Sequence, residues 1–333
     1  MIISRSPVRI TLGGGGTDLP SYYSKYGGAL IAAAVNKYTY VTAYTRLFDN
    51  TIKLNYSVTE QVEKLDDIKH KIFRESLRLL NITKAIELTS LSDIPGRTGL
   101  GTSGSFAVAL LNVLHAYKRD FISQKQLAEE ACKIEIDILK EPIGKQDQYI
   151  SAFGGLTSLT FAKNGNVTVE AVHMSEETRD ELENNIFLFY TGITRQASDI
   201  LKKQNEKSKE NDVTTIETLH EIKRIGLETK KALEKGDIDK LGEFLDIHWM
   251  TKKKLSKDIS NTFMDDCYKL AKNNGALGGK IMGAGGGGFF MFYHNGSNSE
   301  KAIFVKALLK KGLQRMRFHF DFEGSKIMLN MKN

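Results

Sequence analysis

Glycine is concentrated in four short stretches of this chain, at residues 13–16, 96–104, 275–279 and 283–288. A glycine run costs conformational entropy on folding, so it suits places where the backbone turns sharply or approaches another group closely. Two of the stretches contain four consecutive glycines, which makes incidental flexibility a poor explanation for them. The sequence therefore predicts loops whose backbone lies against a ligand.

The chain has 333 residues, enough for two domains, and its content of 41% hydrophobic and 26% charged residues is typical of a soluble globular protein. No apolar run reaches the length of a membrane span, and the N-terminal residues lack the pattern of a secretory signal. The two cysteines, Cys132 and Cys267, offer no disulfide framework and are expected to be free thiols. These features predict a cytoplasmic protein.

The net charge of +7 raises the question of nucleic acid binding. The lysines are spread over the segments 202–209, 223–235 and 252–257, where glutamates are interleaved with many of them, as on solvated helix faces. No zinc-finger spacing, arginine-rich tail or aromatic RNA-binding strand accompanies them. We therefore expect no nucleic acid partner, and a basic balance also suits an enzyme for anionic substrates. The seven histidines are scattered singly and predict surface or packing roles.

Hydrophobic periodicity predicts alternating strands and helices in two α/β parts, an α+β arrangement of layers. The expected strands are 2–4, 8–12, 29–35, 38–46, 85–91, 155–161, 167–172, 186–190 and 289–293, with β-like runs at 315–321 and 325–329. The expected helices are 68–81, 103–118, 124–140 and 301–311, with long amphipathic helices filling 196–273. The texture changes near residue 176, so we expect one domain over 1–175 and a second over 176–333.

The segment Pro95–Ser105 lies between a predicted strand and an almost wholly apolar helix. Free N–H groups at a helix N-terminus bind phosphate, and glycines let the backbone approach it. A hydroxyl in the first turn could reach the accompanying Mg²⁺. A tight turn with a helix cap is the simpler alternative. Gly99, Gly101 and Gly104 also satisfy a dinucleotide fingerprint, but neither the directly preceding strand nor the later acidic residue on a second strand is present.

Two carboxylates follow this segment. Glu135 falls within the apolar stripe of the predicted helix over 124–140, where a carboxylate is costly unless it is paired or holds a cation. A salt bridge and a Mg²⁺ site are both open interpretations. Asp147 is expected in a polar loop just beyond this helix, where it could take the proton of an attacking hydroxyl or simply cap a turn.

Three of the glycine-rich segments, 9–18, 95–105 and 280–288, resemble in this order the three motifs of the GHMP kinases, the family of galactokinase, homoserine kinase, mevalonate kinase and phosphomevalonate kinase. The middle segment is similar to the phosphate loop P-x-x-x-G-L-G-S-S-A, with Thr102 for the first serine and Gly104 for the alanine. The resemblance covers essentially the whole chain. It implies an N-terminal ribosomal-S5-like α/β domain and a C-terminal ferredoxin-like domain, with the site between them.

The resemblance also implies roles for single residues. It makes Asp147 the catalytic base, Arg9 the basic residue near the nucleophile, and Ser103 and Glu135 the ligands of Mg²⁺. The residues expected to bind the phosphates of ATP are Gly96, Gly99, Leu100, Gly101, Thr102, Ser103, Gly104 and Ser105. The residues expected to bind the acceptor are Asp18, which matches an aspartate that grips sugar hydroxyls, and Gly14, Gly15, Gly16, Thr17, Gly285 and Gly286.

The first motif departs from galactokinases and mevalonate kinases, which have G-E-H where this chain has Gly14-Gly15-Gly16. Its form, with G-K-Q-D-Q-Y later, is similar to members of the family that act on D-glycero-D-manno-heptose 7-phosphate. Those enzymes phosphorylate the anomeric oxygen to give the 1,7-bisphosphate used in surface polysaccharides. L-fucose kinases share parts of the pattern. A phosphorylated acceptor needs cationic partners, for which Arg97, Lys145 and Arg195 are the candidates. The oligomeric state is left open, a homodimer included.

Overall fold

The computed structural model describes residues 1–194 and 197–331. Its strands form one eight-stranded and one four-stranded sheet. The first sheet contains β1 (Ile2–Gly13), β2 (Gly28–Thr45), β3 (Ile52–Asn55), β4 (Thr59–Val62), β5 (Ile86–Ser92), β6 (Leu156–Phe161), β7 (Val167–Ala171) and β12 (Lys326–Asn330). The second contains β8 (Ile186–Tyr190), β9 (Gly278–Ile281), β10 (Phe289–Tyr293) and β11 (Gln314–Met316).

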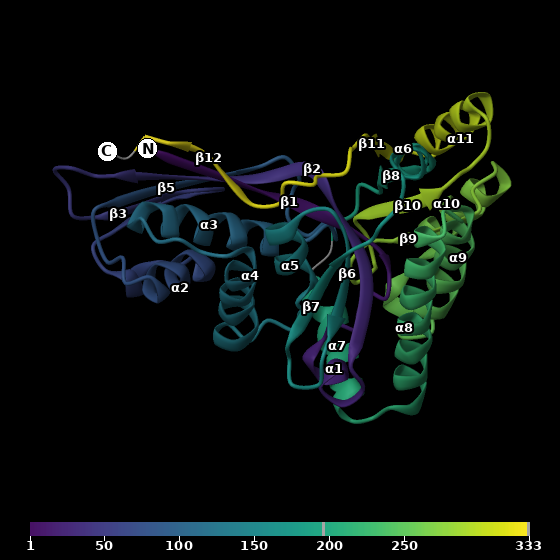
Figure 1. The fold of residues 1–333 in the computed structure, drawn as a ribbon, viewed down its shortest axis with the longest axis horizontal. Coiled ribbons are helices and arrows are strands. Elements are labelled where there is room, and N and C mark those ends of the chain that lie inside the picture. Colours follow the sequence, from purple (N-terminus) through teal and green to yellow (C-terminus); the bar gives the residue numbers. More distant parts are fainter. Residues whose placement is uncertain (195–196, 332–333) are drawn as a thin grey trace.

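Helices accompany both sheets (Figure 1). Those before residue 176 are α1 (Pro20–Tyr26), α2 (Lys71–Leu79), α3 (Thr102–Lys118), α4 (Gln124–Cys132) and α5 (Gln146–Phe153). Those after it are α6 (Glu176–Asn185), α7 (Ala197–Lys209), α8 (Val213–Glu234), α9 (Asp239–Lys252), α10 (Thr262–Asn273) and α11 (Asn298–Lys310). This mixed α/β architecture confirms the predicted fold class. No helix in the described ranges is long and apolar enough to cross a membrane.

Two long strands hold the first sheet together. β2 pairs with β1 along its length, with β6 through its first half and with β5 through its second half. The sequence predicted a break in β2 at Asn36-Lys37, and another in β1 between residues 4 and 8. Both strands are continuous, because the irregularity is absorbed as a shift of register between Pro7 and Val8. α3 packs on β1 and β2, and α8 packs on both strands as well.

Two expected elements differ in detail. The helix predicted over 124–140 ends as an α-helix at Cys132 and continues as a π-helical turn, Lys133–Ile138. Of the two β-like runs near the C-terminus, the first is reduced to β11 and a single bridge between Phe320 and Val35. The short strands β3, β4 and β9 and the helices α1, α5 and α6 were not predicted. Cys132 and Cys267 are free and buried, as expected.

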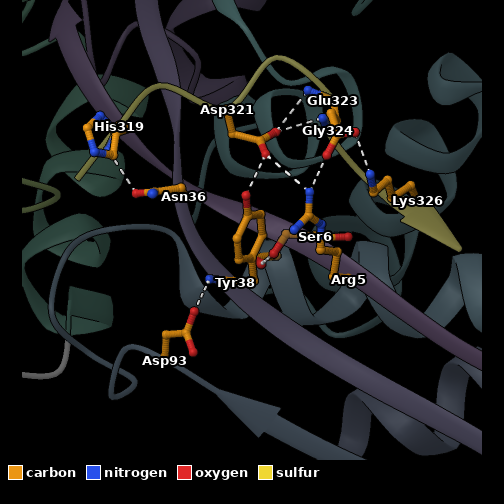
Figure 2. Close-up of polar contacts among 11 residues, drawn as sticks. Arg5, Ser6, Asn36, Tyr38, Asp93, His319, Asp321, Glu323, Gly324 and Lys326 are labelled. Atoms are coloured by element: carbon orange, nitrogen blue, oxygen red, sulfur yellow. Dashed lines mark hydrogen bonds and ion pairs between the residues drawn. The ribbon is translucent and has the colours of Figure 1, made fainter. Parts of the chain in front are cut away.

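The C-terminal segment returns to the first sheet, where β12 pairs with β1 and Met331 N donates to Met1 O at 2.9 Å (Figure 1). Asp321 anchors it (Figure 2). Its carboxylate accepts from Tyr38 Oη at 2.8 Å and from the N–H groups of Glu323 and Gly324 at 3.1 and 2.8 Å. The guanidinium of Arg5 lies 3.9 Å from the same carboxylate. The division of the chain into domains at residue 176 stays a prediction.

Replacing Asp321 with alanine should lower the free energy of unfolding by about 2–4 kcal/mol, because it leaves the Tyr38 hydroxyl and two backbone N–H groups without their acceptor, although Arg5 keeps its ion pair with Glu323. Thermal or urea unfolding measures this change. Glu323→Gln is the control. The Glu323 side chain is 52% exposed, so losing its charge should lower the free energy of unfolding much less. Equal effects of the two changes would contradict the anchoring role of Asp321.

Candidate active site

The segment 95–105 ends in the N-terminus of α3. Gly101 has φ +79°, and α3 begins at Thr102. The first backbone bond of the helix runs from Ser105 N to Gly101 O at 3.0 Å, so the N–H groups of residues 102–104 have no partner within the helix. These residues line a hollow that we call the loop hollow, together with Gly99, Gly101 and Arg97. Such a helix start is an anion site.

Three residues expected to bind phosphate do not line the loop hollow. Leu100 is fully buried, and its carbonyl accepts from Arg9 N at 2.9 Å. The Ser105 hydroxyl donates to the carbonyl of Ser6 at 2.7 Å. Gly96 lies earlier in the loop, with open space around its Cα. Leu100 and Ser105 hold the segment against β1. The other five of the eight predicted residues line the loop hollow.

Glu135 is buried, as its place in the apolar stripe predicted. Its two carboxylate oxygens accept from Ser103 Oγ and, at 2.6 Å, from Gln148 Nε2. Burial raises the pKa of Glu135 to about 7, and these two hydrogen bonds oppose that rise. The structure therefore brings the two predicted Mg²⁺ ligands together at the loop hollow, with a third polar group, Gln148, that was not predicted.

These residues fit a Mg²⁺ ion that is shared with a bound phosphate. A hydroxyl and a carboxylate are the hard oxygen ligands that Mg²⁺ prefers, and the ion usually takes its remaining ligands from water and phosphate. Nowhere in residues 1–194 and 197–331 do three His, Cys, Asp or Glu side chains gather as a metal site of their own. Ser103 and Glu135 would thus hold the ion only together with its phosphate.

Asp147 lies in the first turn of α5 and not in a loop, which corrects the expectation. Its Oδ1 accepts from Arg9 Nε at 2.8 Å, and the second guanidinium nitrogen of Arg9 lies 2.6 Å from the same oxygen. The third nitrogen donates to the carbonyl of Gly99 at 2.6 Å. Gly104, where the family motif has alanine, leaves room for this arrangement, because an added Cβ would lie 2.6 Å from Asp147 Cβ.

A second hollow adjoins the loop hollow, and we call it the Asp18 hollow. Arg9, Asp147, Gly283 and Ala284 line both. Asp18 is buried in the second, where it accepts from Gly16 N at 3.0 Å and Gln146 N at 3.1 Å. Burial raises the pKa of the Asp18 carboxyl, and these N–H donors lower it.

Only part of each remaining glycine loop faces the Asp18 hollow. Gly15 and Gly16 line it, whereas Gly14 packs on Ala29–Leu30 and Thr17 donates to the carbonyl of Gly14 at 2.8 Å. In the last loop, Gly285 packs against Ile259 and Gly286 N donates to Ile259 O at 2.9 Å. Neither lines the hollow, so their predicted contact with the acceptor has no support in the geometry.

The three basic candidates for a substrate phosphate do not gather in the Asp18 hollow. Lys145 donates to the carbonyl of Gly165 at 2.7 Å and lies over the ring of Tyr23, away from both hollows. Arg97 lines the loop hollow. Arg195 lies outside the described residues.

Other basic groups occupy the Asp18 hollow, and none of them was predicted to have a role there, although Lys280 begins the segment 280–288 that resembles the third family motif. They are His248 and Lys252 of α9 and Lys280 of β9, and all three are buried. The histidines were expected only on the surface or in packing, and Lys252 begins a run of three lysines that resembles a solvated helix end. The spacing of four residues between His248 and Lys252 was an available signal, since it places both on one helix face.

Comparison with known families agrees with this geometry. The model of the GHMP kinase N-terminal domain matches residues 66–155, and that of the C-terminal domain matches residues 229–310. The chain belongs to the GHMP kinase family. Among related proteins, D-glycero-alpha-D-manno-heptose 7-phosphate kinase of Campylobacter jejuni is 33% identical, with 98% of each chain covered.

Two further relatives place this GHMP kinase among sugar kinases. An L-fucokinase/L-fucose-1-P guanylyltransferase of Bacteroides fragilis is 26% identical over 96% of this chain, which spans 37% of that protein. A crystal structure of D-glycero-D-manno-heptose 1-phosphate kinase from Bacteroides thetaiotaomicron superposes with a TM-score of 0.82. It is 27% identical and covers the whole of both chains.

Glu135→Gln separates a metal role from a structural one. We expect this variant to be at least as thermally stable as the unmodified protein, because a neutral amide removes the cost of burying a charge. Its activity should require a Mg²⁺ concentration about 10-fold higher or more, since one charged ligand is lost. Magnesium titration of ADP release and a thermal melt measure the two effects. A marked fall in melting temperature with an unchanged Mg²⁺ requirement would make Glu135 a structural residue.

Proposed function

We propose that this GHMP kinase transfers the γ-phosphoryl group of ATP to the anomeric hydroxyl of D-glycero-D-manno-heptose 7-phosphate. The product is the 1,7-bisphosphate, for nucleotide-activated heptose in surface polysaccharides, made in the cytosol. The observation that carries the kinase mechanism is the Arg9–Asp147 pair, which lines both hollows. The loop hollow would hold the phosphates of ATP, and the Asp18 hollow would hold the acceptor.

The relatives support the choice of acceptor. The name of the Campylobacter jejuni protein specifies a heptose 7-phosphate, and that of the Bacteroides thetaiotaomicron structure specifies a phosphate ester of the same heptose. The two names differ in the position of the phosphate. An acceptor phosphorylated at carbon 7 and a product phosphorylated at carbon 1 as well would reconcile the two positions.

Each residue of the pair has a distinct task. The anomeric oxygen attacks the γ-phosphorus, the bond to the β,γ-bridging oxygen breaks, and ADP leaves. Asp147 takes the proton of the attacking hydroxyl. Arg9 holds Asp147 through Oδ1, which leaves Oδ2 to receive that proton, and its positive charge stabilises the transferring group. Mg²⁺ held by Ser103, Glu135 and the nucleotide would supply further neutralisation of phosphate charge.

Asp18 would orient the acceptor. Its carboxylate lines the hollow while backbone N–H groups fix its position, so it can accept from a sugar hydroxyl. Gln146 lies beside it, held by Thr11 Oγ1, which donates to Gln146 Oε1 at 2.6 Å. Both side chains place hydrogen-bonding groups next to Asp147, which would bring one hydroxyl to the base.

Asp147→Asn should lower kcat by about 10²–10⁴-fold, because the amide cannot accept the proton. The protein should stay folded, since Asp147 is partly exposed at 22% and an amide can still accept from Arg9. Steady-state ADP release and a thermal melt test this expectation. Asp137→Asn, an exposed carboxylate nearby in sequence, is the matched control. Turnover close to that of the unmodified enzyme would remove Asp147 from the role of base.

The acceptor is identified by ADP release with heptose 7-phosphate, L-fucose, galactose, mannose and mevalonate, followed by NMR of the product. We expect turnover with heptose 7-phosphate and a second phosphate at the anomeric carbon. Turnover of L-fucose alone would support a fucose 1-kinase and overturn the choice of acceptor. The kinase reaction itself would then stand.

A further inference from the structure

Three buried groups in the Asp18 hollow have no role in the mechanism above. His248 and Lys252 lie one turn apart on α9, and Lys280 lies on β9, against which α9 packs. Their exposed fractions are 1%, 8% and 3%. They line the Asp18 hollow but not the loop hollow, so they lie on the acceptor side. Buried cations are rare in proteins, and each one calls for a compensating partner.

The protein itself supplies little compensation. Lys252 donates to the carbonyl of Gly283, and Lys280 Nζ lies 3.4 Å from His248 Nδ1. No carboxylate oxygen within the described ranges comes within 4.0 Å of either lysine nitrogen. Of the two aspartates that line the hollow, Asp147 is bonded to Arg9 and Asp18 to backbone N–H groups. A buried ammonium without a carboxylate is destabilising, unless a ligand brings the negative charge.

A further donor points to the same conclusion. Gln204 of α7 lines the Asp18 hollow and is buried, with 8% exposed. Its Nε2 has no hydrogen-bond acceptor anywhere in the described part of the chain. The amide nitrogen and the two ammonium groups can only donate hydrogen bonds. A ligand that satisfies all three must therefore present several acceptor oxygens and a negative charge.

We propose that Lys252, Lys280 and Gln204 form a subsite for the phosphate group that the acceptor carries before the reaction. This inference rests on the proposed function and replaces Lys145 and Arg97 as candidate partners of that phosphate. His248 is a positioning residue. Its pKa is lowered well below the ordinary value by burial and the two lysines, so the imidazole is neutral, and its Nδ1 lies 3.4 Å from Lys280 Nζ. The subsite requires a ligand whose oxygens reach both lysine nitrogens, and the phosphate group of a sugar phosphate meets this requirement.

The test compares acceptors with and without a phosphate. In Lys280→Met and Gln204→Leu, we expect the KM for heptose 7-phosphate to rise about 10–100-fold, as charged hydrogen bonds are lost. The kcat/KM for unphosphorylated heptose should change less than about 3-fold. Lys254→Met, an exposed lysine two residues after Lys252, is the matched control. An equal loss of kcat with both acceptors would make these residues stabilisers of the transferring phosphoryl group and overturn the subsite.

A binding measurement without ATP separates this inference from the proposed function. Heptose 7-phosphate or a hexose 6-phosphate should raise the melting temperature of the unmodified protein but not that of Lys280→Met. If heptose 7-phosphate is inert and another sugar phosphate is turned over with a KM that depends on Lys280, the choice of heptose fails and the subsite stands. If only unphosphorylated sugars bind, the subsite fails.

The pH dependence gives a further check. Burial lowers the pKa of Lys252 to about 8, so the ammonium loses its proton as pH rises through that value in the empty enzyme. The charged and titratable groups that face it come from α9, β9, β1, α5 and the loop after β1, and they are His248, Lys280, Arg9, Asp147 and Asp18. The second ionisation of a phosphate monoester lies near pH ~6. The KM for the phosphorylated acceptor should therefore be lowest between about pH 6 and 8.

Above pH 8 that KM should rise in the unmodified enzyme and rise less in Lys252→Met. Burial, Lys252 and Arg9 also lower the pKa of Lys280 well below its ordinary value, so Lys280 contributes part of the rise. The same profile measured with unphosphorylated heptose is the control, and it should show no rise of KM above pH 8 in either protein. A rise that is undiminished in Lys252→Met, or that appears equally with the unphosphorylated acceptor, would assign the titration to another group and count against the subsite.

Discussion

Two glycine loops meet backbone to backbone between the sheets, and the active site depends on this contact. Gly99 and Gly283 both have positive φ, at +84° and +67°. A Cβ on Gly99 would lie 2.6 Å from the carbonyl oxygen of Met282, and one on Gly283 would lie 2.7 Å from the Cα of Gly99. Two backbone bonds complete the junction, from Phe289 N to Thr98 O and from Arg9 N to Leu100 O. A side chain at either position would push the two loops apart. It would thereby displace the residues that line both hollows.

The same contact explains what the glycines do and do not do. They were predicted to lie against a ligand, and Gly15, Gly16, Gly99, Gly101 and Gly104 line a hollow. Others fill a structural need, because the backbone of a neighbouring segment takes the space that their side chain would occupy. Gly14 lies against Ala29 and against Gly226 of α8 in this way. Sequence alone cannot separate the two uses, since both demand the absence of a Cβ.

The sequence pattern within one helix or loop was enough to predict the positions of residues that depend only on that element. The apolar stripe on one helix was enough to place Glu135 on the buried side, and the glycine-rich segment was correctly expected to lead into the helix that begins at Thr102. Asp147 was assigned to a loop, because the helix that carries it, Gln146–Phe153, is short and follows a polar segment. Lys252 and Lys280 were missed for a different reason. They are 28 positions apart in the sequence, and only the packing of α9 on β9 brings them into one hollow. No periodicity within either element reports that contact.

The two hollows carry uncompensated charges of opposite sign. On the loop side, Glu135 is a buried carboxylate whose oxygens meet only neutral donors, Ser103 and Gln148. On the other side, Lys252 and Lys280 are buried lysines that hydrogen-bond only to neutral groups, and the carboxylate of Asp18 in the same hollow acts on Lys252 without forming an ion pair with it. The two sets do not neutralise each other, because the Arg9–Asp147 pair stands between them as a closed ion pair. Each charge destabilises the empty protein. A cation delivered with ATP would relieve the first, and an anionic acceptor would relieve the second. The buried charges lower the stability of the empty enzyme, and binding of both substrates would remove this cost. The ternary complex is thereby favoured over the complex with ATP alone or with the acceptor alone.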